Sequence, residues 1–64
     1  MQEIIIKDFY GRILGKIETH ANGNKTVRDF YGRILGYYDA RLNVTRDFYN
    51  RIIAKGDVSS SLIS

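Results

Sequence analysis

Short runs rich in β-branched and apolar residues alternate along the chain with segments that contain Gly, Asn or Asp. The runs lie at residues 4–6, 13–14, 25–27, 34–35, 43–45 and 52–53. Runs of this length and composition are typical of β-strands, and the residues between them are typical of tight turns. The pattern predicts an all-β protein with about six short strands in an up-and-down meander.

A helix is the competing interpretation, because Phe9, Ile13 and Ile17 fall at helical spacing. Glycines at 11, 15, 32 and 36 would each cost a helix about 1 kcal/mol. The helical alternative is therefore rejected for residues 1–57. The C-terminal tail, residues 58–64, is expected to be either a short helix with Asp57 as its N-cap or a flexible end.

One motif occurs three times. The segment from Lys7 to Gly15 recurs from Arg28 to Gly36, with eight consecutive residues identical, and more loosely from Arg46 to Ala54. Internal repeats of this kind indicate repeated supersecondary units. The chain is therefore interpreted as three tandem β-hairpins that form one domain, residues 1–57.

The chemistry of a tight turn explains most of the repeated motif. An aspartate opens each turn, and the residue three positions later is Gly11, Gly32 or Asn50. Glycine and asparagine are the residues that tolerate the left-handed conformation of a three-residue hairpin turn. In that register each aspartate faces the following arginine, so an ion pair is expected at the pairs Asp8–Arg12, Asp29–Arg33 and Asp47–Arg51.

The small size of the chain favours self-association. Neighbouring apolar residues such as Ile13 and Leu14 point to opposite faces of a strand, so both faces need cover. The 64 residues contain no cysteine, and a domain of this size has only marginal stability on its own. We expect a radial or barrel-like sheet that is completed by oligomerisation, and therefore a homo-oligomer.

The tandem form Asp-x-x-Gly-Arg-Ile-x-Gly resembles the small bacterial and phage β-flower proteins, whose hairpins radiate around a pseudo-symmetric axis. The resemblance covers about residues 4 to 57. The chain departs from it in two ways, since it has three units rather than four and carries Tyr10, Tyr31 and Tyr49 where the family commonly has Asn. The resemblance implies a fold and no activity.

Composition and charge exclude several classes of function. No cysteine and a single histidine, His20, leave no set of metal ligands, and no cofactor is expected. No apolar stretch is long enough to span a membrane and no signal peptide is evident, so a cytoplasmic location is expected. Identical copies give their aspartates identical environments, which does not suit general acid–base catalysis. An enzyme is not expected.

The net charge of +3 can attract anions or merely aid solubility. Arginines with nearby aromatic side chains suit phosphate and base recognition. The candidate ligand-binding residues are two phosphate contacts, Arg28 and Arg46, three orienting arginines, Arg12, Arg33 and Arg51, and two stacking tyrosines, Tyr37 and Tyr38. The candidate interface residues are the tip aromatics Phe9, Tyr10, Phe30, Tyr31, Phe48 and Tyr49.

The leading hypothesis is a non-enzymatic homo-oligomer that captures an anionic, nucleotide-like ligand between subunits. A structural or protein-interaction module is the first alternative, and weak nucleic-acid binding is the second. No membrane partner is expected. His20 is interpreted as an ordinary surface-loop residue.

Overall fold

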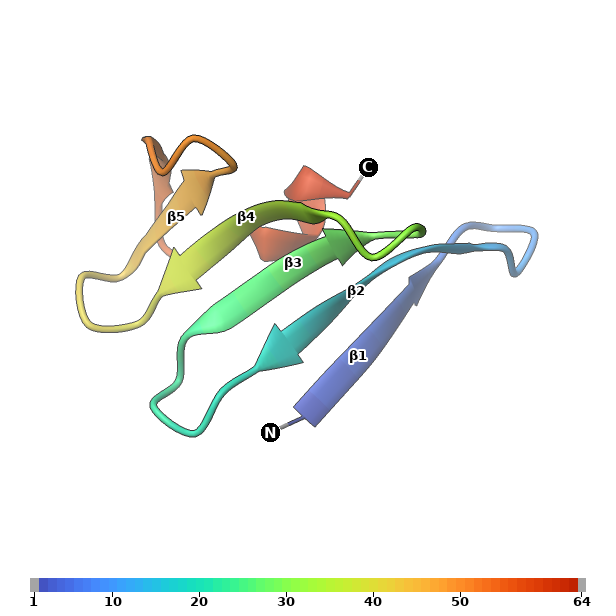
Figure 1. Cartoon of the computed structure of the whole chain (residues 1–64), viewed down its shortest axis with the longest axis horizontal. Coiled ribbons are helices and arrows are strands. Elements are labelled where there is room, and N and C mark those ends of the chain that lie inside the picture. Colours follow the sequence, from blue (N-terminus) through green and yellow to red (C-terminus); the bar gives the residue numbers. More distant parts are fainter. Residues whose placement is uncertain (1, 64) are drawn as a thin grey trace.

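A computed structural model describes residues 2–63 and contains one antiparallel sheet whose six strands follow one another in chain order (Figure 1). The predicted meander of three tandem hairpins is confirmed. The elements are β1 (Gln2–Lys7), β2 (Ile13–Thr19), β3 (Lys25–Asp29), β4 (Ile34–Asp39), β5 (Val44–Asp47), β6 (Ile52–Lys55) and the 3₁₀-helix η1 (Ser59–Leu62).

The three hairpin turns have one geometry. In the first, the Gly11 N–H donates to the Asp8 carbonyl, and the Asp8 N–H donates to the Arg12 carbonyl. The third position of each turn is left-handed, with φ of 83° at Gly11, 85° at Gly32 and 70° at Asn50. The exchange of Gly for Asn in the third copy therefore preserves the backbone conformation that the turn requires.

Each hairpin also contains a β-bulge next to its turn, with the extra residue on the second strand of the hairpin. The pairing shifts by one residue between Ile6 and Lys7, between Val27 and Arg28, and between Thr45 and Arg46. Bulges increase the local twist and bend the strand that carries them. The three shifts lie at equivalent positions, so each hairpin bends in the same way.

The buried apolar core is small. Val27 is fully buried, Ile17 and Val44 are nearly so, and η1 packs behind β3 and β4 in the view of Figure 1. The tail thus covers part of one sheet face within the chain. The sheet remains open, because β1 and β6 are its two edges, so the chain alone does not form the barrel-like arrangement.

The tail begins its helical turn differently from the expected N-cap. Val58 is the N-cap residue of η1, and no side chain within residues 2–63 caps the helix. Asp57 instead accepts the Ser59 N–H through Oδ1 and pairs through Oδ2 with Lys25 on β3. The Asp57 carboxylate therefore fixes the tail to the sheet. No helix in the part of the chain described here is long and apolar enough to cross a membrane.

Candidate functional site

The hairpin tips carry three copies of one Asp–Arg–Tyr cluster. In the first, Asp8 Oδ1 accepts the backbone N–H groups of Tyr10 and Arg12 at 2.8 and 2.9 Å, and its Oδ2 accepts Arg12 Nε at 2.8 Å. The guanidinium of Arg12 lies 5.5 Å from the centre of the Tyr10 ring. The second tip repeats all of these contacts, and the third repeats those that Arg51 makes with Asp47 and Tyr49. The three predicted ion pairs are confirmed.

These contacts engage the three arginines predicted to orient a ligand, Arg12, Arg33 and Arg51. Each donates Nε to its own aspartate and covers its own tyrosine, while about three quarters of its side chain stays exposed. Exposed pairs of this kind contribute little to stability. The tip arginines are therefore part of the turn architecture, with their remaining N–H groups facing solvent.

Acid should weaken the tips. Hydrogen bonds from the backbone N–H of Arg12 and of Arg51 hold the pKa of Asp8 and of Asp47 below the usual 3.8. At Asp29, partial burial raises the pKa, but the hydrogen bonds from Arg33 and Tyr31 outweigh it and the net shift is downward. A lowered pKa in the folded state stabilises the protein above pH 3.8, and this contribution is lost as the pH falls through the folded pKa.

We therefore expect the urea concentration at the unfolding midpoint to decrease as the pH is lowered from about 5 through the folded pKa values of these aspartates. A variant with Asn at positions 8, 29 and 47 retains the turn acceptors and should lose less on the same titration. An equal fall in both proteins would contradict the assignment, since Glu18 and Asp57 would then account for the acid sensitivity.

The tip phenylalanines differ in their surroundings. Phe30 lines an open groove of about 690 Å³ with Arg12, Ile13 and Leu14 of the preceding hairpin. Phe48 lines the equivalent groove on the second hairpin. The exposed fractions of Phe30 and Phe48 are 62% and 59%, whereas Phe9, in the first of the three hairpins, is 96% exposed. The predicted interface residues thus include two that already pack partly within the chain.

Most of the carboxylates form ion pairs with cationic side chains, but several cations have no such partner. Within residues 2–63, six of the seven carboxylates hold a Lys or Arg partner. Asp39 is the exception, because its Oδ1 accepts the N–H groups of Arg41 and Leu42 in the β4–β5 turn. Four cations in the same range make no ion pair: Lys7, Arg41, Arg46 and Lys55. The excess positive charge resides in these four side chains.

Arg28 and Arg46 occupy equivalent positions in the repeat but have different partners. Arg28 donates its Nε–H to Glu18 at 2.7 Å and another N–H to the Gly32 carbonyl at 2.9 Å. The hydrogen bond between Arg28 and Glu18 holds the pKa of Glu18 below its usual value. Among the described residues, Arg46 keeps only the contact with the turn, in which it donates an N–H to the Asn50 carbonyl at 3.1 Å. The counterpart of Glu18 is Asp39, which is one methylene shorter and bonds to its own turn.

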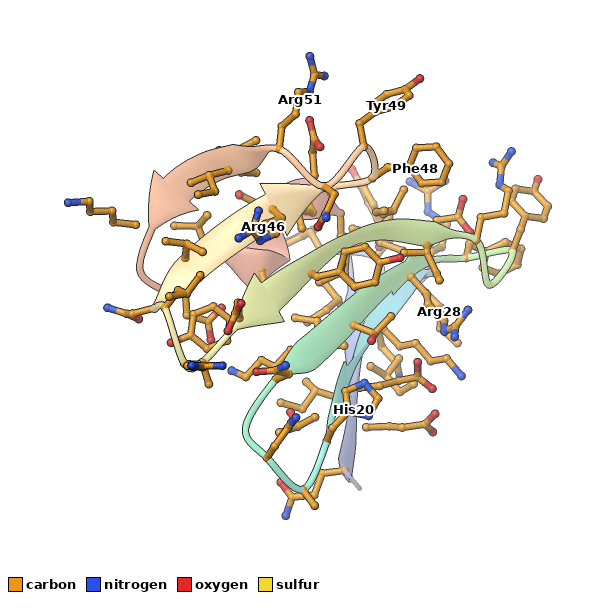
Figure 2. The ribbon with its side chains drawn as sticks, turned by 60° about the vertical axis from the view of Figure 1, so that its left-hand side comes forward. His20, Arg28, Arg46, Phe48, Tyr49 and Arg51 are labelled. Atoms are coloured by element: carbon orange, nitrogen blue, oxygen red, sulfur yellow. The ribbon has the colours of Figure 1, made fainter. Side chains whose placement is uncertain are left out.

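Arg46 lies in a pocket of about 250 Å³ on the sheet face, which we call the Arg46 pocket. Thr26, Tyr37 and Arg46 form a row across β3, β4 and β5, since Thr26 pairs with Tyr37 and Tyr37 with Arg46. Figure 2 shows Arg46 on the viewer's side of the sheet and His20 at the lower turn, away from the tip residues Tyr49 and Arg51. The lining residues are His20, Asn24, Lys25, Thr26, Tyr37, Tyr38, Asp39, Arg46 and Asn50.

The two candidate stacking tyrosines have different roles. Tyr37 is half-buried beside Arg46, and its hydroxyl makes no hydrogen bond to any residue between 2 and 63. Tyr38 donates its hydroxyl to Asn43 Oδ1 at 2.6 Å, and Lys25 Nζ lies 5.7 Å from its ring centre. Both rings line the pocket. Tyr38 is engaged in its contacts with Asn43 and Lys25, so Tyr37 is the ring available to a ligand.

His20 belongs to this pocket, which sequence reasoning did not anticipate. One imidazole nitrogen, Nε2, lies 2.8 Å from Thr26 Oγ1. The turn after β2 repeats the tip geometry, with the His20 N–H donating to the Asn24 carbonyl and the Gly23 N–H to the His20 carbonyl. The sequence His20–Asn24 could therefore have been recognised as a turn of the same type. That recognition would have placed His20 at the base of a hairpin, opposite Thr26.

The pocket provides donors, acceptors and one aromatic face. Among the described residues, no group of three or more His, Cys, Asp or Glu side chains could hold a metal ion. Comparisons with protein-family models, with curated proteins and with solved structures found no match. The resemblance to the β-flower proteins therefore stays a prediction, and the pocket itself is the basis on which a function can be argued.

Proposed function

We propose that this chain is a non-enzymatic, self-associating binding protein that captures a small anion with an aromatic ring, of the nucleotide class. The observation that carries the proposal is the state of Arg46. Within residues 2–63 it is the one pocket-lining cation without a carboxylate partner, because Lys25 pairs with Asp57. Its neighbour across the strand is the ring of Tyr37.

The chemistry of the pocket suits one phosphate and one base. An arginine donates paired N–H groups to phosphate oxygens, and an aromatic ring stacks on a base with a gain of about 1–3 kcal/mol. Thr26, Asn50 and His20 add polar atoms around these two groups. The 250 Å³ volume lies just below the usual range for small-molecule sites, about 300–1,000 Å³. A ligand the size of a nucleoside monophosphate fits this description best.

The position of Asp39 limits the number of phosphate groups that the ligand can carry. Its carboxylate lines the same pocket and has no cation partner among the described residues. A negative group beside Arg46 disfavours ligands with several phosphates and can accept a hydrogen bond from a ribose hydroxyl or an amino group. The proposed ligand therefore carries one phosphate.

The test compares Arg46→Ala with Arg28→Ala, its equivalent in the repeat. Isothermal titration with AMP, GMP, cyclic mononucleotides and inorganic phosphate should show binding of at least one nucleotide to the wild type. Arg46→Ala should weaken that binding tenfold or more, since it removes a charge-assisted contact. Arg28→Ala should change it less than threefold, because Arg28 is occupied by Glu18.

A second variant uses the repeat itself as a guide. Tyr37→Lys introduces the residue that the first hairpin carries at this position, Lys16, and should remove the stacking contribution while leaving the charge favourable. Loss of nucleotide binding with retained phosphate binding would support the two-part site. No heat of binding for any ligand in the panel would overturn the proposal.

A protein-interaction module is the second candidate, and the observation that favours it is the exposure of the tips. Phe9 is 96% and Tyr10 79% exposed, and they meet edge to face at 5.5 Å between ring centres. Exposed aromatic pairs of this kind are enriched at interfaces. Under this alternative, Phe9→Ser with Tyr10→Ser would abolish association and leave folding intact, whereas Arg46→Ala would have no effect. Weak nucleic-acid binding would instead appear as affinity that falls steeply with salt.

A further inference from the structure

The outer edge of β1 is long, apolar and unpaired. β1 has six residues, is the first strand of the open sheet and has a neighbour on one side only (Figure 1). Ile4 and Ile5 point to opposite faces of the sheet and are 51% and 47% exposed. The extra residue of the adjacent bulge, Leu14, lies on β2, so β1 itself is regular. Such an edge is a template for another strand.

The other edge of the sheet excludes one arrangement of two copies. Where β3 pairs with β2, a Cβ on Gly15 would lie 2.3 Å from the Arg28 carbonyl oxygen, and a Cβ on Gly36 would lie 2.4 Å from that of Arg46 where β5 pairs with β4. β6 has Ala54 at the equivalent position. The Cβ of Ala54 would overlap the backbone of a strand that paired with β6 in the way that β3 pairs with β2. β1 of another copy therefore cannot add to β6 in this way, which excludes a head-to-tail chain of copies.

The hydrogen bonds of the first turn determine which amides face outward. The N–H and C=O of Asp8 both point into its own hairpin. Along a regular antiparallel strand these groups alternate in direction from one residue to the next. The N–H and C=O groups of Glu3, Ile5 and Lys7 therefore point away from β2, toward the open edge.

We infer that β1 pairs antiparallel with β1 of a second copy, around a two-fold axis at Ile5. In this register Ile5 faces the partner's Ile5 and the outward amides meet as hydrogen-bonded pairs. Glu3 lies opposite the partner's Lys7, on the same sheet face, and the symmetry makes this pair twice. Lys7 is one of the four cations without an ion pair within the described chain. In the dimer, Glu3 of the second copy is its acidic partner.

The charged side chains of β1 also favour this register over the alternative registers of the β1–β1 pair. A shift that centres the axis on Glu3 or on Lys7 would bring identical charges together, which is destabilising. Shifts that centre it on Ile4 or Ile6 would place Ile5 opposite a charged side chain. Only the Ile5-centred register pairs both charges and stacks apolar side chains on apolar side chains.

This inference deepens the proposed self-association and rests on it, but not on ligand capture. The Arg46 pocket is formed by the β2–β3 turn, β3, β4, β5 and the third hairpin turn, and none of its lining residues lies on β1. Dimerisation and ligand binding are therefore separately measurable.

The test uses sedimentation velocity on the full chain over a range of concentrations. The wild type should shift from 7.4 kDa toward twice that mass as concentration rises. Lys7→Glu alone and Glu3→Lys alone should each weaken the dimer tenfold or more, and the double variant Glu3→Lys with Lys7→Glu should restore it. Restoration is the diagnostic result, because the loss of the Glu3–Lys16 pair within the chain is the same in the double variant.

A backbone modification tests the edge directly. A synthetic chain with N-methyl-Ile5 loses an outward donor and should stay monomeric with an unchanged circular dichroism spectrum. N-methyl-Ile4 alters an amide that faces β2 and should destabilise the fold, which checks the assignment of directions. A wild type that remains at 7.4 kDa at millimolar concentration, or a dimer that survives N-methyl-Ile5, would overturn the inference. Nucleotide binding by the monomeric N-methyl-Ile5 chain would show that the proposed ligand site stands independently.

Discussion

Replacing Gly15 with alanine is expected to remove most of the folding stability of this protein. The new Cβ would lie 2.3 Å from the Arg28 carbonyl oxygen and 3.2 Å from the Asp29 Cα. Both atoms belong to the backbone of β3, so no side-chain rotation relieves the overlap. Forced expansion in a packed region costs about 1–3 kcal/mol or more, and a domain of this size has about 3–5 kcal/mol in total. Urea unfolding followed by circular dichroism should show the midpoint reduced by half or more.

The third hairpin provides the matched control. Ala54 stands at the position equivalent to Gly15, on an edge strand with no neighbour beyond it. Ala54→Gly should therefore cost only about 0.5–1 kcal/mol, the usual entropic penalty of glycine in a strand. If Gly15→Ala proved no worse than Ala54→Gly, the close approach of β3 to β2 would not be the reason for glycine at this position.

The second large effect is expected for Thr45→Val, which detaches the C-terminal tail. Thr45 is fully buried, and its hydroxyl donates to the Gly56 carbonyl at 2.7 Å and accepts the Val58 N–H at 3.1 Å. Valine has a similar shape but no hydroxyl, so both backbone groups would lose their partner. Leaving a buried polar group unsatisfied costs about 1–3 kcal/mol. Urea unfolding should report a loss of about 2 kcal/mol, and the Val58 amide should exchange its hydrogen faster.

Thr19→Val is the comparison for this prediction. Thr19 lies at the end of β2, and its hydroxyl makes no hydrogen bond within the described residues. The same chemical change there should shift stability by less than about 0.5 kcal/mol. Equal losses in the two variants would mean that the hydroxyl of Thr45 does not hold the tail and that valine is simply unfavourable in this sheet.

The departures between copies carry more information about binding than the motif that the copies share. Asp, Gly or Asn, and Arg recur because each turn needs them, and the contacts between Asp and Arg are the same at all three tips. Lys16 and Glu18 of the first hairpin become Tyr37 and Asp39 in the second. The first change adds an aromatic ring, and the second leaves Arg46 without an acid. Together they convert a structural ion pair into a candidate ligand site.

Local chemistry made the fold predictable. Turn type follows from the residue that must be left-handed, and Gly11, Gly32 and Asn50 identify it without any long-range information. Strand positions follow from short β-branched runs between turns. Of the candidate site, Tyr37 was predictable as a departure from the repeat and Arg46 as a cation that recurs beside the motif aspartate, whereas the difference in partners between Arg46 and Arg28 was not predictable. Whether Glu18 reaches Arg28 depends on cross-strand geometry and on one methylene of side-chain length.

The sequence by itself determined three hairpins, their turns and the tip ion pairs, because all of these depend on residues within five positions of one another. Only the tertiary structure decided that the sheet stays open, that the tail packs on β3 and β4, that His20 joins the Arg46 pocket and that Gly15 and Gly36 lie close to the backbone of the next strand. These features depend on how strongly each hairpin twists and on where it meets its neighbour. Twist and docking arise from the packing of many residues far apart in the chain, and no short segment encodes them.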